Sequence, residues 1–154
     1  MLLTVGYKAM NENRKRVFES LQAQGYHLAS CISSRAIVDS NELGCGTIIL
    51  PGAMVGPFVS LGNCCVLYSQ AVLAHHDKVG DFCFFAPGAA IAGNVRLGEG
   101  CFLGANCTVK NGTCLGKHVL VGAGAYLSHD ATDGEVIAPT RSITLDCSSI
   151  DMSL

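Results

Sequence analysis

The sequence predicts an all-β fold, a parallel β-helix of hexapeptide repeats, and two regularities lead to this prediction. First, every sixth residue from Ile37 to Leu127 is bulky and apolar, over sixteen consecutive hexads. Second, the third place of the hexad is often glycine, and the sixth is nearly always small or β-branched. A period of six fits neither the 3.6 of an α-helix nor the 2 of a simple strand. It is typical of a β-helix in which each hexad forms a short strand and a bend.

Three hexads make one triangular coil of eighteen residues, and the second-place side chain points inward. Coils stack at about 4.8 Å, so residues eighteen apart lie in one column. Sixteen hexads give a little over five coils, and repeat arrays need about three units to be stable. We therefore predict a β-helix over residues 34–131, preceded by a β-α-β unit over 1–33 and followed by a cap or tail over 132–154.

Each part of the β-α-β unit has its own signal. Residues 2–6 are apolar and predict a buried strand, and residues 27–32 predict a second one. Between them residues 11–24 predict a helix that ends near Gly25, a plausible C-cap. We expect Val17, Phe18 and Leu21 on its packed face and Arg14, Lys15 and Arg16 towards solvent. After Ala131 the hexad pattern fails, because Asp133 takes the apolar place.

The composition narrows the classes of function. The chain has 154 residues, a net charge of −2 and a pI near 6.2, and no basic stripe predicts binding to nucleic acid. Its first residues do not resemble a signal peptide. No apolar run approaches the roughly 18 residues that span a membrane. We therefore expect a cytoplasmic protein with no nucleic-acid or membrane partner.

The nine cysteines favour packing over metal binding. Cys65, Cys83 and Cys101 are eighteen apart at the sixth place and should stack in one internal column, where small apolar side chains fill tight corners. No Cys-x-x-Cys occurs, so the sequence does not predict a zinc framework. The remaining cysteines follow no disulfide pattern.

Candidate catalytic residues are polar ones outside the hexad rule. A β-helix has flat faces, so a small-molecule site needs the cleft between neighbouring subunits of a trimer. His75, His76 and Asp77 form the most conspicuous polar cluster. A histidine with a pKa near 6.5 accepts a proton at physiological pH, and a neighbouring histidine or aspartate orients its ring. The alternative from the residues alone is a pair of solvated histidines at a bend.

Residues 37–131 resemble the left-handed β-helix acyltransferases. The segments His-His-Asp-Lys-Val-Gly (75–80) and Ala-Ile-Ala-Gly-Asn-Val-Arg-Leu-Gly (90–98) are similar to the nucleotide-sugar branch, akin to sialic-acid O-acetyltransferases and bacillosamine-type N-acetyltransferases. Residues 5–30 also resemble the end of that family's N-terminal sugar-nucleotide domain, whose phosphate-binding Gly-rich turn has no counterpart here. The resemblance implies a left-handed homotrimer that moves an acetyl group from acetyl-CoA, without a metal, to an amine or hydroxyl of a nucleotide-linked sugar.

The resemblance also implies roles for residues at the histidine corner. His75 stands where the family has its general base, and His76 stands where a carboxylate often orients that base. His76 and Asp77 both remain candidates for the orienting role. Gly93, eighteen residues after His75, matches the glycine whose backbone N–H faces the acyl carbonyl, where an oxyanion donor is worth about 3–4 kcal/mol.

Further positions match those that meet the cofactor. Phe84 stands where some members carry a histidine near the thioester, so that polar contact is absent. Ala105 and Ala123 match positions that line the pantetheine arm. Lys110 and Lys117 are candidates for contacts with the phosphates of coenzyme A.

Two other functions remain open from the sequence. The first is a non-catalytic trimeric scaffold or an inactive truncated remnant of the enzyme. The second is a zinc lyase of the γ-carbonic anhydrase type, which shares the fold. In the column of His75, however, histidine recurs only at His129, three coils or about 14 Å away. Zinc–nitrogen bonds of roughly 2.0–2.1 Å do not span that distance, so the sequence favours the acyltransferase.

Overall fold

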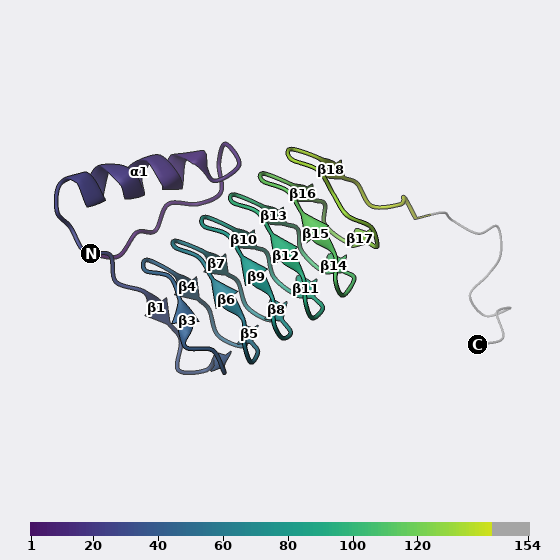
Figure 1. Ribbon diagram of the computed structural model, residues 1–154, viewed down its shortest axis with the longest axis horizontal. Helices are drawn as coiled ribbons and strands as arrows, with labels where there is room; N and C mark the ends of the chain where they lie inside the picture. Colours follow the sequence, from purple (N-terminus) through teal and green to yellow (C-terminus); the bar gives the residue numbers. More distant parts are fainter. Residues whose placement is uncertain (143–154) are drawn as a thin grey trace, which may run out of the picture.

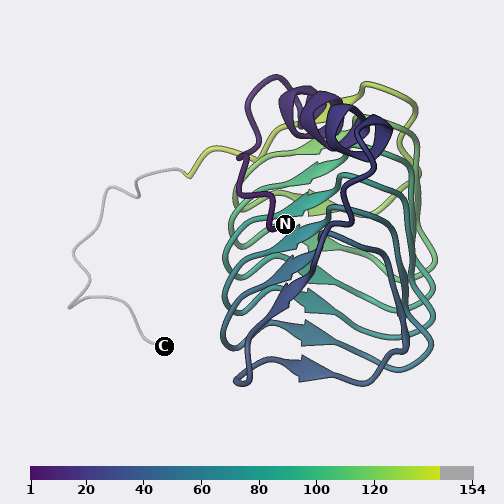
Figure 2. The ribbon, with the colours of Figure 1, turned by 90° about the vertical axis from the view of Figure 1, so that its left-hand side faces the viewer.

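A computed structural model describes residues 1–142 and confirms the parallel β-helix. Short strands form three parallel sheets, which are the three faces of a prism (Figure 1). The coils are left-handed and stack along the long axis of the prism, and the helix α1 (Glu12–Ala23) lies outside it along one edge (Figures 1 and 2). The sequence therefore correctly predicts the architecture.

We name the three faces A, B and C. Face A contains β1 (Cys31–Ile32), β4 (Ile48–Ile49), β7 (Val66–Leu67), β10 (Phe84–Phe85), β13 (Phe102–Leu103), β16 (Leu120–Val121) and β18 (Val136–Ile137). Face B contains β2 (Ile37–Val38), β5 (Met54–Val55), β8 (Val72–Leu73), β11 (Ala90–Ile91), β14 (Thr108–Val109) and β17 (Tyr126–Leu127). Face C contains β3 (Glu42–Leu43), β6 (Ser60–Leu61), β9 (Lys78–Val79), β12 (Arg96–Leu97) and β15 (Cys114–Leu115).

The second residue of a strand points into the prism and the first points outward. Inward residues such as Leu67, Phe85 and Leu103 are fully buried in one continuous core. Through the middle of the prism, paired residues are eighteen apart, as in Val66↔Phe84↔Phe102. The sixth-place residues fill the corners of the same core, and the predicted column of Cys65, Cys83 and Cys101 is confirmed. Each of these thiols donates to the carbonyl oxygen of a glycine on the next coil, at 3.1–3.3 Å.

The first coil departs from the predicted register. Strand β2 pairs with β5 so that Ile37 faces Met54 and Val38 faces Val55. Val38 therefore packs against the core, and Ile37 is 58% exposed on the outside. The prediction that the inward series starts at Ile37 is wrong by one residue. Ile37 and Val38 are both β-branched and apolar, so either one satisfies the pattern, and only the pairing with β5 decides between them.

The N-terminal segment does not form the predicted β-α-β unit. Residues 2–6 form no strand, and β1 belongs to face A, where it pairs with β4. Met1 exchanges hydrogen bonds with His27 and Ala29, and the pairing goes no further. The outer side of face A is apolar, and the N-terminal segment packs its side chains on it. The ring centroids of Tyr7 and Phe84, for example, are 5.0 Å apart. Burial against this face replaces the strand pairing that the sequence suggested.

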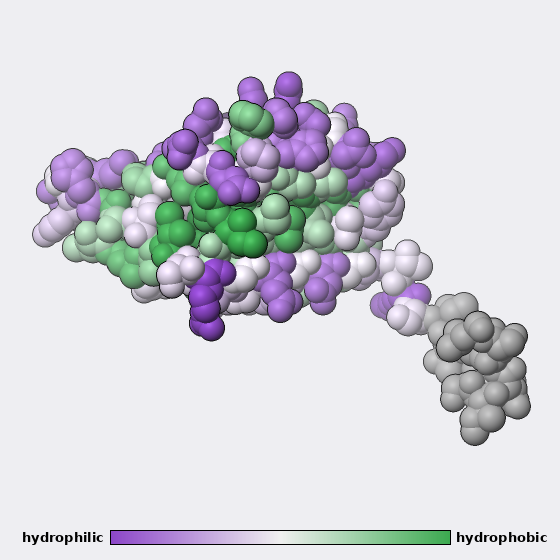
Figure 3. Space-filling view, turned by 90° about the horizontal axis from the view of Figure 1, so that it is seen from below, coloured by the Kyte–Doolittle hydropathy of each residue, from purple (hydrophilic) through white to green (hydrophobic). Residues whose placement is uncertain are grey.

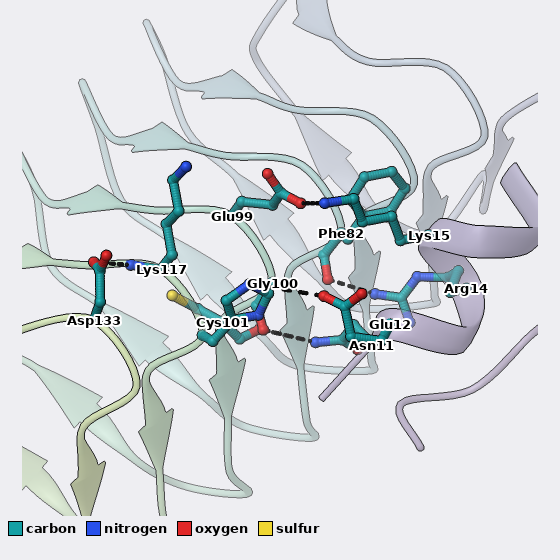
Figure 4. A network of polar contacts seen from close by, with 11 residues as sticks. Asn11, Glu12, Arg14, Lys15, Phe82, Glu99, Gly100, Cys101, Lys117 and Asp133 are labelled. Carbon is teal, nitrogen blue, oxygen red and sulfur yellow. Dashed lines mark hydrogen bonds and ion pairs between the residues drawn. The ribbon is translucent and has the colours of Figure 1, made fainter. Parts of the chain in front are cut away.

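The helix α1 docks along the corner between faces C and A through a buried arginine (Figure 4). Arg14 is 1% exposed, which corrects the prediction that it faces solvent. Its Nε donates to the carbonyl oxygen of Cys64 at 2.9 Å and its Nη2 to that of Phe82 at 2.7 Å, on two successive coils. Arg14 shares the packed stripe with Phe18 and Leu21 at helical spacing. The prediction placed Arg14 in solvent because its side chain is charged, despite this spacing. At the corner, however, backbone carbonyl oxygens accept hydrogen bonds from the guanidinium and compensate its burial.

Polar contacts extend this docking over further coils (Figure 4). Asn11 Nδ2 donates to the carbonyl oxygen of Gly100 at 3.0 Å, and Lys15 forms an ion pair with Glu99. Burial lowers the pKa of Arg14, the expected effect of desolvating a charge. The helix thus binds consecutive coils of one corner and does not cover faces B and C.

The β-helix continues into the segment predicted as a cap or tail. Strand β18 pairs with β16 on face A, with Leu120 opposite Val136. The last coil is shorter than eighteen residues, and there Asp133 Oδ1 accepts the backbone N–H of Lys117 at 2.7 Å. The predicted tail beyond residue 142 lies outside the described residues. Among residues 1–142, no helix is long and apolar enough to cross a bilayer.

Candidate active site

The corner between faces B and C carries two exposed histidines side by side. His75 and His76 form the bend between β8 and β9. The Nδ1 atoms of the two rings are 3.1 Å apart, and the rings meet edge to face with their centroids 5.3 Å apart. At that separation one Nδ1 donates and the other accepts. The pair therefore fixes the orientation of each ring and leaves both Nε2 atoms available to solvent or a ligand.

The fold holds His76 in place in two ways. Its backbone is left-handed, with φ of 58°, and its N–H donates to the carbonyl oxygen of Pro57 on the preceding coil at 3.1 Å. Its ring also lies against that of Phe58, with centroids 4.8 Å apart, although Phe58 is 74% exposed. Phe58 was not singled out from the sequence. Its position eighteen residues before His76 is the signal that identifies it.

Gly93 lies on the next coil, directly beside the His75 ring. A Cβ at Gly93 would collide with Cε1 and Nε2 of His75 and lie 2.7 Å from Nδ1. The two coils are joined here, because Asn94 N–H donates to the His75 carbonyl at 2.9 Å. Within residues 1–142, the N–H of Gly93 donates to no other backbone group. A glycine is required for the imidazole to occupy this space.

Asp77 occupies the corner from the inside. It is fully buried at a sixth place, and its Oδ1 accepts the N–H of Val95 on the next coil at 2.8 Å, while Oδ2 has no partner among the described residues. Burial raises the pKa of Asp77 to about 6, against the opposing effects of the Val95 amide and nearby His75. Asp77 makes no hydrogen bond with either histidine, so the orienting contact to His75 comes from His76.

The other predicted cofactor residues gather at a different corner. Ala105 and Ala123 stand between faces A and B, and together with Phe84 they line a groove of about 320 Å³. Phe84 is buried and stacks on Phe102, with the ring planes 6° apart. Tyr7 and Tyr68, which the sequence did not single out, complete the apolar wall of the groove. Gly93 is separate from this group and lies with His75.

The structure thus divides the predicted residues into two half-sites. The histidine corner and the alanine groove lie at opposite edges of face B, about 20 Å apart for a side of six residues. Lys110 and Lys117 are also separated, because Lys110 follows β14 at the B–C corner and Lys117 follows β15 at the C–A corner. The prediction that Lys110 and Lys117 contact phosphates of coenzyme A stays a prediction, and within one chain the two lysines lie at different corners. Their seven-residue separation places them at different corners of a six-residue repeat.

No metal centre is formed by the described part of the chain, where no three histidine, cysteine, aspartate or glutamate side chains converge. The eight cysteines among residues 1–142 are free thiols.

Comparison with known proteins places this geometry in context. The family described as the hexapeptide repeat of succinyl-transferase matches residues 94–129. The acetyltransferase domain of PglB from Neisseria gonorrhoeae, solved with acetyl coenzyme A, is 28% identical and superimposes with a TM-score of 0.80, covering 84% of this chain and 66% of that one. PerB from Caulobacter crescentus, solved with CoA and GDP-perosamine, is 29% identical with a TM-score of 0.79, covering 82% of this chain and 61% of that one.

The chain resembles the hexapeptide-repeat sugar N-acetyltransferases. It spans less than two thirds of the length of these solved proteins. WeeI from Acinetobacter baumannii, 23% identical with a TM-score of 0.74 over 83% of this chain and 63% of that one, shares the fold. No curated protein sequence matches the chain.

Proposed function

We propose that the chain is an acetyl-CoA-dependent acetyltransferase that acts on an amine or hydroxyl of a nucleotide-linked sugar. One observation carries the proposal: the His75 ring lies against Gly93 at an exposed corner, held there by His76. The solved proteins that resemble the chain support the substrate class, because PglB was solved with acetyl coenzyme A and PerB with CoA and GDP-perosamine.

His75 is the general base in the proposed reaction. With Nδ1–H donated to Nδ1 of His76, its Nε2 keeps a free lone pair and accepts the proton of the acceptor as the acceptor attacks the thioester carbonyl. A C–N or C–O bond forms, the C–S bond breaks, and the proton passes from His75 to the departing thiolate, which leaves as CoA. The N–H of Gly93 stabilises the oxyanion before that bond breaks, and no acyl-enzyme forms. Asp77 holds the histidine coil against the Gly93 coil through Val95.

The active unit is a homotrimer in this proposal. The two half-sites lie at opposite edges of face B, so a cleft between protomers brings the histidine corner of one against the alanine groove of the next. The outer side of face B supports this arrangement, because its outward residues include Met54, Val72 and Ala90, and Figure 3 shows a hydrophobic patch on the side where β5, β8 and β11 lie. Analytical ultracentrifugation should then give three times the 16.1 kDa of one chain.

Thiol release from acetyl-CoA, screened against nucleotide-linked amino sugars and simpler amines, tests the activity. Replacing His75 by Ala should lower turnover at least a hundredfold, the typical contribution of general-base catalysis. The trimer mass and thermal midpoint should be unchanged, because the ring is exposed. His27→Ala removes an exposed histidine elsewhere and serves as the matched control. Full turnover by the His75→Ala protein would remove His75 from the mechanism.

A non-catalytic trimeric scaffold is the second candidate function. A well-folded trimer that shows no binding of acetyl-CoA by calorimetry would establish the scaffold and exclude the enzyme.

A further inference from the structure

Face C presents two positive charges side by side next to the histidine corner. Lys78 begins β9 and Arg96 begins β12, and the two residues are directly paired across neighbouring strands. Both are first residues of their strands and point outward, and both side chains are exposed. In the same outward column, Ser60 stands on one side of the pair and Cys114 on the other. The adjoining outward positions therefore supply no carboxylate.

This arrangement is unfavourable unless something else compensates it. Directly opposed like charges on neighbouring strands, about 4.8 Å apart, destabilise a sheet. Ion pairs between residues 1 and 142 join Lys15 to Glu99 and His118 to Glu12, and neither involves the pair on face C. Every other outward strand position that the structure describes is uncharged except Glu42, two strands from Lys78. The cations are thus concentrated at one place on the prism, with no ion-pair partner among residues 1–142.

Lys78 and Arg96 belong to the same two coils that carry His75 and Gly93 of the candidate active site. Lys78 follows His75 by three residues and Arg96 follows Gly93 by three residues, a reach of about 10 Å in each case. The coil with the proposed base and the coil with the proposed oxyanion donor therefore each direct one cation to the same side of the corner. The alanine groove lies on the opposite side, beyond face B.

We propose that Lys78 and Arg96 bind phosphoryl groups of a substrate whose reacting end lies at His75, an inference that rests on the proposed acetyltransferase function. The guanidinium of Arg96 matches two phosphate oxygens in a bidentate fork, and the ammonium of Lys78 acts as a point charge beside it. The phosphates belong to the diphosphate of a nucleotide-linked acceptor or to CoA. The reach of about 10 Å from His75 favours the acceptor, because the long pantetheine arm of CoA separates its phosphates further from the thioester.

Isothermal titration with three probes tests the site without turnover. Inorganic pyrophosphate tests phosphoryl binding, GDP represents a nucleotide-linked acceptor, and CoA represents the other source. The test protein carries Lys78→Gln and Arg96→Gln. The control carries Arg16→Gln and Arg35→Gln, two exposed arginines off face C, and it loses the same charge. All titrations are run at one low ionic strength, because exposed charges are screened by salt.

We expect the Lys78→Gln/Arg96→Gln protein to bind pyrophosphate and GDP about tenfold more weakly than wild type, equivalent to 1.4 kcal/mol. CoA binding should be unchanged, and the control should match wild type for all three probes. A loss confined to pyrophosphate and CoA would support the site and assign it to CoA. Absence of pyrophosphate binding to wild type, or equal binding by wild type and the double variant, would overturn the site. Thiol release is not used, so the result stands apart from the test of His75.

Discussion

Asp77 makes the stability of the fold depend on pH in a direction opposite to that of most carboxylates. Burial raises its pKa from an ordinary 3.8 to about 6, so between these values the unfolded chain ionises while the folded chain does not. The free energy of unfolding falls as pH rises through this window, because the unfolded chain gains stability by releasing the proton that the buried carboxyl group of the folded chain keeps. Well below the unfolded pKa of 3.8, Asp77 is protonated in both states and does not lower the free energy of unfolding. Above the folded pKa of about 6, the loss of free energy of unfolding reaches its full size.

The size of the effect follows from the same two values. Each pKa unit corresponds to about 1.4 kcal/mol, so the full cost is about 3 kcal/mol. Asp77→Asn removes the charge, and its side-chain oxygen still accepts the Val95 N–H. A small part of the cost is already present at pH 4, so the stability of the variant relative to wild type should be about 2.5 kcal/mol greater at pH 8 than at pH 4.

Urea unfolding at pH 4, 5, 6, 7 and 8 measures this difference. The protein concentration is held fixed, because assembly makes apparent stability concentration-dependent. Asp39 is exposed, and Asp39→Asn is the matched control, whose effect should be the same at pH 4 and pH 8. A constant difference between Asp77→Asn and wild type across this range would refute the reasoning, and so would an Asn variant that loses relative stability as pH rises.

Two further substitutions test the corner and the helix. Gly93→Ala should lower thiol release at least tenfold, because the new methyl group displaces the His75 ring. Gly6→Ala is its control, because no atom lies within 4 Å of the added Cβ. Unchanged turnover in the Gly93→Ala protein would contradict the contact between Gly93 and His75. Arg14→Ala should lower the free energy of unfolding by about 3 kcal/mol in urea, because it leaves buried carbonyl oxygens unpaired. Exposed Arg16→Ala should change it by less than about 0.5 kcal/mol, and an equal loss in both arginine variants would show that Arg14 does not anchor the helix.

The repeat made most of the prism predictable, because a period of six allows one backbone path and one inward position. It also placed residues in columns, so the contact between His75 and Gly93 followed from a separation of eighteen. The same rule would have found Phe58 beneath His76. At Ile37 the rule failed, since two adjacent β-branched residues fit either register and only strand pairing distinguishes them.

The contacts of the N-terminal segment were not predictable in the same way. Arg14 is charged, and the residues around it do not reveal its acceptors. These are the carbonyl oxygens of Cys64 and Phe82, which lie fifty or more residues later in the chain and come together only at a corner of the folded prism. The predicted strand over residues 2–6 likewise gave way to packing on face A, whose apolar outer side is visible only once the coils are stacked. Both errors have one cause, which is that the partner surface is created by the fold.

The sequence by itself determined the prism, its inward series from Leu43 to Leu127 and the residues that share each corner, because a strict period leaves little conformational freedom. Only the tertiary structure decided that His76 rather than Asp77 contacts His75, that Asp77 is buried, and that Phe84, Tyr7 and Tyr68 complete the wall of the alanine groove. These relations depend on side-chain directions and on the angles between faces. Periodicity specifies which residues stack, but through-space geometry determines which of them meet.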